Sequence, residues 1–153
     1  MNPYELAELL RDELVVQLEQ SRAGAVQLAT VHPGDMVPAY STCAMAAVRV
    51  AAITPQVPGA GCGTPTSWDV TLDLAVNRCY PENDPSRTPD MGVLADLANC
   101  GVSDAEAMMR ALCVVPDDYT WTPGAWRPVG PQGGVYGGVM QVTVHDLDAP
   151  CCP

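Results

Sequence analysis

The feature that most constrains the fold is the stretch WRPVGPQGGVYGGVMQVTV, which runs from Trp126 to Val144. Two glycine pairs in it precede a segment, Met140–Val144, in which apolar and polar residues alternate. Alternation with a period of two is typical of a half-buried β-strand. Glycines just before such a strand favour a tight turn, because glycine adopts backbone conformations that other residues avoid. The stretch therefore predicts a β-hairpin.

A phosphate-binding loop is the less favoured interpretation of the same glycines. Such a loop lies between a strand and the N-terminus of a helix. Here a strand pattern follows the glycines, the chain has no lysine, and Pro131 lacks a backbone N–H. A second glycine-rich segment, GAGCG at Gly59–Gly63, is not followed by a helix pattern either.

The N-terminal segment predicts an amphipathic helix. Residues Asn2–Glu5 combine an N-cap, a proline at the first helical position and a capping-box glutamate. Leucines at every fourth position from Leu6 to Leu18 form an apolar stripe, and charged residues occupy the other face. One side of this helix is therefore expected to be buried, and its end is expected near Ala23–Gly24.

The rest of the chain predicts strands in pairs with helices between the pairs. The most regular alternation is in Ser67–Pro81, and further strands are expected near 48–53, 126–129 and 140–144, while 26–30 has a short strand pattern. A helix starts at Thr88–Pro89 and ends at Asn99–Gly101. A capping box at 103–106 then starts a second short helix.

This order of elements predicts an α+β fold. We expect an N-terminal amphipathic helix, a mainly antiparallel sheet of about four strands, and one or two short helices between the strand pairs. A single domain is expected over residues 1–153, because a chain of this length can bury one core. The tail from about residue 147 is expected to be irregular.

The charge balance bears on the class of partner. The chain has 18 acidic residues against seven arginines and a formal net charge of −11. Proteins that bind DNA or anionic membranes use clustered basic residues, and the arginines here are scattered. Tight binding to either is therefore disfavoured, although DNA can pass close by. No apolar run reaches the roughly 18 residues that span a membrane.

The seven cysteines raise the question of a metal or thiol site. The acidic N-terminus lacks the basic start of a signal peptide, so reduced thiols in a cytoplasm are expected. Structural zinc needs thiols at CxxC spacing, and no such pair occurs. The HDLD segment, His145–Asp148, resembles a ligand cluster, but neighbouring residues on a strand point to opposite faces. We therefore expect no metal and no cofactor.

A catalytic site needs a positioned base, and the chain has two histidines, His32 and His145. No flanking motif marks either as the partner of a nucleophile, although a Cys–His pair formed in space remains open. Asp117 and Asp118 are interpreted as solvated loop carboxylates.

Tryptophans are the other candidate functional residues. Trp68 alternates with apolar positions and is expected in the core. Trp121 and Trp126 lie beside prolines, where packing and an interface role are equally compatible. With no catalytic motif in sight, the residues favour a domain that acts through protein contacts and not as an enzyme.

Three segments together resemble small neck proteins of long-tailed phages that infect actinobacteria, known as head-to-tail connector or tail terminator proteins. They are a strand ending in Arg78–Pro81, a Leu/Met helix through Met108–Cys113, and a hairpin with the pattern Trp-x-Pro-x-Gly-Pro-x-Gly-Gly at Trp126–Gly134. The resemblance covers the chain from about Cys43 to Val144. The segment CGVSD at Cys100–Asp104 departs from it as a local insertion.

The resemblance implies a structural virion protein that forms an oligomeric ring, commonly hexameric, in the head–tail neck. Its partners would be other copies of itself, the tail tube protein and neighbouring neck proteins, and DNA would pass through without specific binding. It would act in the virion after assembly in the bacterial host cytoplasm. Hairpin or subunit-interface roles follow for Trp126, Arg127, Gly130, Gly133, Gly134, Gly137 and Gly138.

Two other classes of function stay open. One is a small cytoplasmic thiol- or metal-dependent hydrolase, which predicts a bound metal or a hyper-reactive thiol. The other is a regulatory protein-binding module, which predicts a stable monomer or dimer with a foreign partner.

Overall fold

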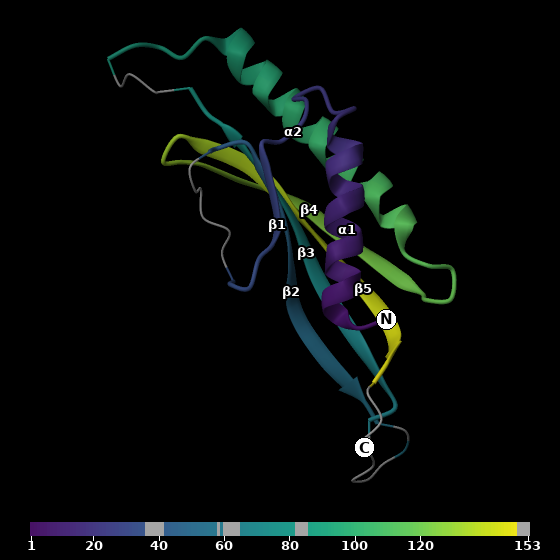
Figure 1. Cartoon of the computed structure of the whole chain (residues 1–153). Helices are drawn as coiled ribbons and strands as arrows, with labels where there is room; N and C mark the ends of the chain where they lie inside the picture. The colour runs from purple at the N-terminus through teal and green to yellow at the C-terminus, as the bar shows by residue number, and fades with distance from the viewer. Residues whose placement is uncertain (36–41, 58, 60–64, 82–85, 150–153) are drawn as a thin grey trace.

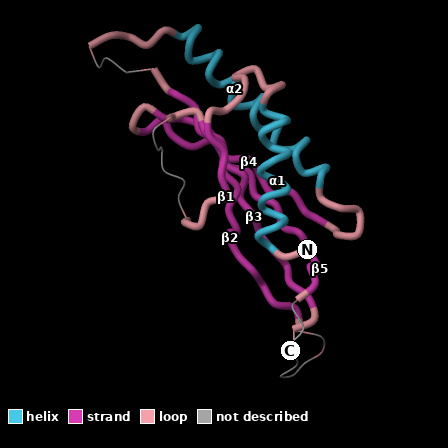
Figure 2. The backbone as a smooth tube through the Cα atoms, viewed as in Figure 1, coloured by secondary structure: helices cyan, strands magenta, loops and turns pink. Residues whose placement is uncertain are grey.

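The computed structural model of this chain describes residues 1–35, 42–57, 59, 65–81 and 86–149. Across these residues one sheet has the strand order β1-β2-β3-β5-β4. Its strands are β1 (Leu28–Val31), β2 (Met45–Gln56), β3 (Ser67–Cys79), β4 (Trp121–Gln132) and β5 (Val135–Asp148). The helices α1 (Pro3–Leu18) and α2 (Met91–Ala111) lie on the same face of the sheet, and a 3-10 turn, Leu112–Val114, follows α2 (Figure 1, Figure 2).

Helix α1 forms as its capping pattern predicts. The Asn2 side chain accepts hydrogen bonds from the backbone N–H groups of Tyr4 and Glu5, both at 2.9 Å. The Glu5 carboxylate accepts in turn from the Asn2 N–H at 2.8 Å, which completes the capping box. The predicted leucine stripe is fully buried: Leu6, Leu10, Leu14 and Leu18.

The core lies between the two helices and one face of the sheet. Alternate residues of the central strands supply the sheet side, among them Val48, Leu72, Leu74 and Val142, all with no exposed surface. Each such side chain stabilises the fold by roughly 1.5–3 kcal/mol relative to an exposed one. The opposite face of the sheet, called here the open face, carries no helix in the described residues. None of the described helices is both long and apolar enough to cross a membrane.

The predicted fold class is wrong in its sheet. Instead of about four mainly antiparallel strands, the sheet has five strands and mixed pairing. Strand β1 runs parallel to β2, from Leu28 opposite Met45 to Val31 opposite Val48, while the other pairings are antiparallel. The short pattern at 26–30 overlaps β1, which has only four residues and is not among the four strands expected. Alternation also carries no information on strand direction, so the parallel pairing could not be seen in it.

The prediction of one or two short helices is also wrong, because α2 is one continuous helix of 21 residues. The residues interpreted as a helix end and a new cap make tertiary contacts instead. Gly101 packs against the Trp126 ring, which would lie 3.7 Å from a Cβ added at this position, an ordinary contact distance. The Ser103 hydroxyl accepts a hydrogen bond from the Arg22 N–H at 2.9 Å.

A buried ion pair fixes the middle of α2 to β3. The Arg78 guanidinium donates two hydrogen bonds to the Asp104 carboxylate, at 2.9 and 2.8 Å. The Ser21 hydroxyl donates a third at 2.6 Å. Arg78 and Asp104 are 5% and 3% exposed, so this network holds the turn after α1, strand β3 and helix α2 together away from water.

The hairpin strands are longer than their patterns predict. Strand β4 starts at Trp121, before the strand expected at 126–129, and β5 continues through Asp148, into the tail expected to be irregular. Three prolines interrupt the alternation of β4, namely Pro123, Pro128 and Pro131. They are tolerated because β4 is an edge strand, where an outward N–H has no partner to lose. The Cys151–Cys152 tail lies outside the described residues.

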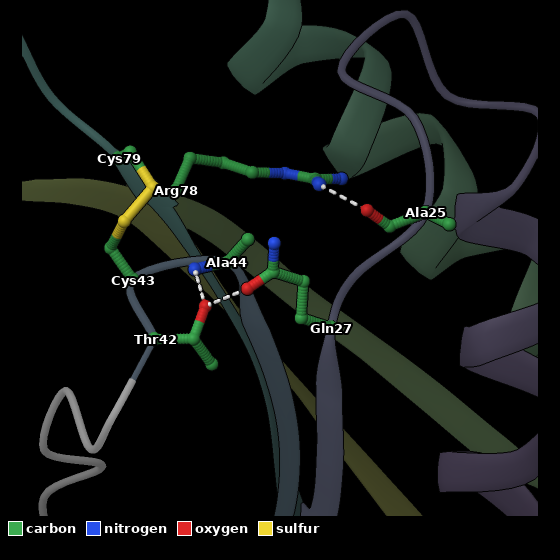
Figure 3. Close-up of a disulfide and its surroundings, with 7 residues drawn as sticks. All are labelled: Ala25, Gln27, Thr42, Cys43, Ala44, Arg78 and Cys79. Carbon is green, nitrogen blue, oxygen red and sulfur yellow. Dashed lines mark hydrogen bonds between the residues drawn. A yellow bond between two sulfur atoms is a disulfide. The ribbon is translucent and has the colours of Figure 1, made fainter.

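A disulfide joins Cys43 to Cys79 (Figure 3). The expectation that all thiols stay reduced is therefore wrong for this pair. The sheet register explains the contact, because Met45 at the start of β2 lies opposite Asn77. Cys43, two residues before Met45, therefore comes to lie opposite Cys79, two residues after Asn77, with 4.9 Å between the Cα atoms. The bond ties the start of β2 to the end of β3, beside the buried Arg78.

Candidate functional site

The glycine-rich hairpin turns at Gly133–Gly134. Gln132 and Val135 are paired across the turn, and the two glycines have φ angles of 59° and 74°. Positive φ at both central residues is the geometry of the tight turns that match the strand twist. The glycines before the strand thus shape a hairpin, as the sequence predicts, and a strand follows them where a phosphate loop needs a helix.

The second glycine pair, Gly137–Gly138, allows close packing within the sheet. A Cβ on Gly137 would lie 1.9 Å from the backbone oxygen of Val76 on β3. A Cβ on Gly138 would lie 2.3 Å from the Trp126 ring. Trp126 therefore lies between Gly138 of β5 and Gly101 of α2, with its indole against both.

An apolar groove lies between α2 and this hairpin. It has a volume of about 420 Å³ and is lined by apolar and aromatic residues, including Leu94, Leu97, Val102, Trp126, Val129 and Tyr136. A neighbouring hollow extends it along α2 from Val102 to Met109. We call Leu94, Leu97, Val102, Met109, Trp126 and Val129 the α2–hairpin surface.

Three aromatic residues, Tyr80, Trp126 and Tyr136, give the groove its polar side-chain atoms. The buried Trp126 Nε1 has no hydrogen-bond partner in the described residues. Tyr136 packs edge-to-face against Tyr80, with 6.1 Å between ring centres. Burial, with smaller contributions from the nearby Cys100 and Asp104 side chains, raises the pKa of the Tyr136 phenol to about 12. The groove floor is therefore uncharged in the physiological range, which suits an apolar partner and not a charged substrate.

The α2–hairpin surface includes three exposed apolar side chains. Val102, Met109 and Val129 are 54%, 41% and 49% exposed. Residues 94, 98, 102, 105 and 109 recur at the three- and four-residue spacing that places them on one side of a helix. A contiguous exposed apolar patch with a groove in it marks a contact surface for another molecule.

Polar cross-strand contacts cover the open face of the sheet. Arg49 on β2, Asp73 on β3 and Gln141 on β5 lie side by side and bond to one another. One rung further, the hydroxyls of Thr71 and Thr143 are 3.1 Å apart. Pairs of this kind stabilise a sheet by tenths of a kcal/mol to about 1 kcal/mol each.

His145 forms the next polar contact on this face. Its Nδ1 lies 3.3 Å from Asp69 Oδ2, and its Nε2 lies 3.1 Å from the Thr122 hydroxyl. Carboxylate, imidazole and hydroxyl in this order resemble a hydrolase relay. The hydroxyl lies on β4, opposite Thr143 of β5, and the three residues continue the polar ladder of the sheet. We therefore assign them to sheet pairing, a contact that sequence spacing could not reveal.

The other residues weighed as catalytic are not brought together. His32 bonds to the Gly34 backbone in its own turn, and Asp117 and Asp118 are exposed before β4. Of the described cysteines outside the disulfide, Cys113 is exposed and Cys100 is half-buried beside Tyr136. In the part of the chain that is described, no three metal-binding side chains gather in one place.

The remaining tryptophans pack as core residues. Trp68 and Trp121 are both half-buried against the core cluster, as is Trp126, so packing accounts for all three. Trp126 also lines the groove.

Comparison with known proteins gives no relative from which a function could be inferred for this chain. No protein-family model matches the chain, and no curated protein matches it.

Proposed function

We propose that this chain is a structural subunit of an oligomeric ring in the head–tail neck of a long-tailed phage, of the tail terminator or head-to-tail connector type. The proposal starts from the resemblance of the Arg78–Pro81, Met108–Cys113 and Trp126–Gly134 segments to such neck proteins. The ring is expected to be hexameric and to contact the tail tube protein and neighbouring neck proteins.

The observation that carries the proposal is the α2–hairpin surface. Its three exposed aliphatic residues, Val102, Met109 and Val129, lie on two rigid elements, and the groove between them can take apolar side chains of a neighbour. A ring subunit needs such a surface, because each copy must bury one patch against a different patch of the next copy.

The rest of the molecule agrees with a ring that DNA crosses. The net charge of −11 repels the phosphate backbone, which keeps DNA from adhering in transit. The described residues that line the groove include no Asp, Glu, His, Lys, Arg or Cys, so the groove lacks the acids and bases of a catalytic pocket.

Val102→Glu is expected to weaken self-association at least tenfold while leaving the monomer folded. A glutamate at this exposed position would place a charge in an apolar contact, and in an interface this costs more than about 1.4 kcal/mol, the equivalent of a factor of ten. Analytical ultracentrifugation over a range of concentrations measures the change.

The matched control is Val16→Glu on α1. Val16 and Val102 are 50% and 54% exposed, and both lie on helices, but Val16 is outside the α2–hairpin surface. Association equal to the wild type is expected for Val16→Glu. Equal association of Val102→Glu and Val16→Glu would contradict the proposal that subunits contact one another through the α2–hairpin surface.

A further inference from the structure

A second hollow lies on the open face of the sheet, on the opposite side from the helices. It has a volume of about 420 Å³, and polar side chains from four neighbouring strands line it: Arg49, Asp73, Arg127 and Gln141. Two of the chain's seven arginines thus line one small hollow.

Both carboxylate oxygens of Asp73 in this hollow already have a partner. Asp73 is 5% exposed. One of its oxygens is bound by the Arg49 guanidinium, and the other accepts a hydrogen bond from the Gln141 amide at 3.0 Å. Arg49 uses Nη2 for this bond, and no bond is described from its Nε or Nη1. The Arg49–Asp73 ion pair therefore holds the Arg49 guanidinium in place and leaves its Nε and Nη1 groups able to donate to another molecule.

Arg127 stands out among the arginines. Arg11, Arg22, Arg49, Arg78, Arg87 and Arg110 all have a hydrogen bond or another electrostatic partner. Arg127 is the one arginine of the described residues without such a partner, in a chain whose acidic residues outnumber its arginines by 18 to seven. A cation left unpaired on so acidic a protein is available to an external anion.

The charges of the hollow select the class of anion. Arg49 and Arg127 contribute two positive charges and Asp73 one negative charge, which leaves one net positive charge. A monoanion balances it, whereas a dianion such as phosphate would leave the hollow with a net negative charge beside Asp73. Guanidinium groups bind the planar carboxylate with two parallel hydrogen bonds. The hollow is therefore suited to a carboxylate.

We propose that an Asp or Glu side chain of a second copy of this chain enters the hollow and is bound by Arg127 and Arg49. This inference rests on the proposed ring. Charge complementarity identifies the occupant: every copy exposes many carboxylates and has a net charge of −11, so copies that approach each other repel unless cations lie at the contact. The open face supplies these cations on the side of the sheet that no described helix covers.

Arg127→Glu tests the inference directly. Association constants are measured by analytical ultracentrifugation at low and high salt for the wild type, Arg127→Glu, Arg127→Gln and the control Arg22→Glu. Arg22→Glu is the matched control because it makes the same change of charge on the helix side of the sheet. The Arg22 side chain is 54% exposed and forms a surface ion pair. Arg127 has no partner to lose among the described residues, so an unchanged melting temperature is expected for its variants.

We expect at least tenfold weaker association for Arg127→Glu, a smaller loss and a weaker salt dependence for Arg127→Gln, and wild-type association for Arg22→Glu. If Arg127→Glu associates as the wild type does, the proposed carboxylate contact is wrong, while the proposed ring is unaffected. Equal losses for Arg127→Glu and Arg22→Glu also overturn it, since general repulsion then explains both. A wild-type protein that never associates overturns the second copy as occupant and the ring together.

Discussion

Asp104→Ala is expected to lower the free energy of unfolding by about 3–5 kcal/mol, the range for breaking one side of a buried ion pair. The variant leaves the Arg78 guanidinium 5% exposed and without its carboxylate, and it also removes the acceptor of the Ser21 hydroxyl. A domain is normally stable by only about 5–15 kcal/mol. The loss therefore removes a large share of the total.

The other aspartate–arginine pair of α2 is the natural control. Asp96 contacts Arg22 at 3.1 Å with both side chains more than half exposed, so Asp96→Ala is expected to cost at most about 1 kcal/mol. Urea unfolding followed by circular dichroism measures both variants. Equal losses for Asp104→Ala and Asp96→Ala would contradict the role given to burial. The double variant Arg78→Met/Asp104→Leu is expected to recover much of the stability, because no charge is then left buried.

Gly137→Ala is expected to destabilise the fold by about 3 kcal/mol or more, at or above the upper end of ordinary overpacking. The added Cβ would lie 1.9 Å from the Val76 oxygen, a backbone atom of a central strand that cannot turn aside as a side chain would. The pairing of β3 with β5 must therefore open locally. The expected result is a markedly lower midpoint in urea, with the near-ultraviolet signal of the neighbouring Trp126 altered.

Gly134→Ala separates this steric effect from the loss of glycine flexibility. Gly134 has a φ of 74° but nothing within 4 Å of an added Cβ. The variant is expected to cost only about 1–2 kcal/mol, the strain of a left-handed non-glycine residue. If Gly134→Ala is the more damaging of the two, the close approach of β3 and β5 is not what requires glycine at 137.

The sequence predicts best what local chemistry determines. The Asn2–Glu5 cap, the leucine stripe of α1 and the glycine hairpin each depend on residues close together in the chain, and all form as expected. Features that depend on contacts between residues far apart in the chain could not be predicted from the sequence. Ser103 and Asp104 have the composition of a helix start, but their partners Arg22 and Arg78 let the helix continue through them.

The same distinction applies to the candidate sites. The sequence singled out Trp126, Arg127 and the hairpin glycines, and the structure places Trp126 in the groove and Arg127 on the open face. The α2 side of the groove and the Arg49–Asp73–Gln141 row were missed, because they exist only once the strand register is known. The Cys43–Cys79 disulfide was missed for the same reason.

The central claim, a ring built from copies of this chain, is tested most directly on the wild-type protein by native mass spectrometry combined with negative-stain electron microscopy. The protein is measured alone and mixed with tail tubes of the phage proposed to encode it. The account predicts one dominant closed oligomer, hexameric by resemblance, seen end-on as a ring with a central opening or capping the tube end. A protein that remains monomeric at every concentration and does not bind the tubes would contradict it.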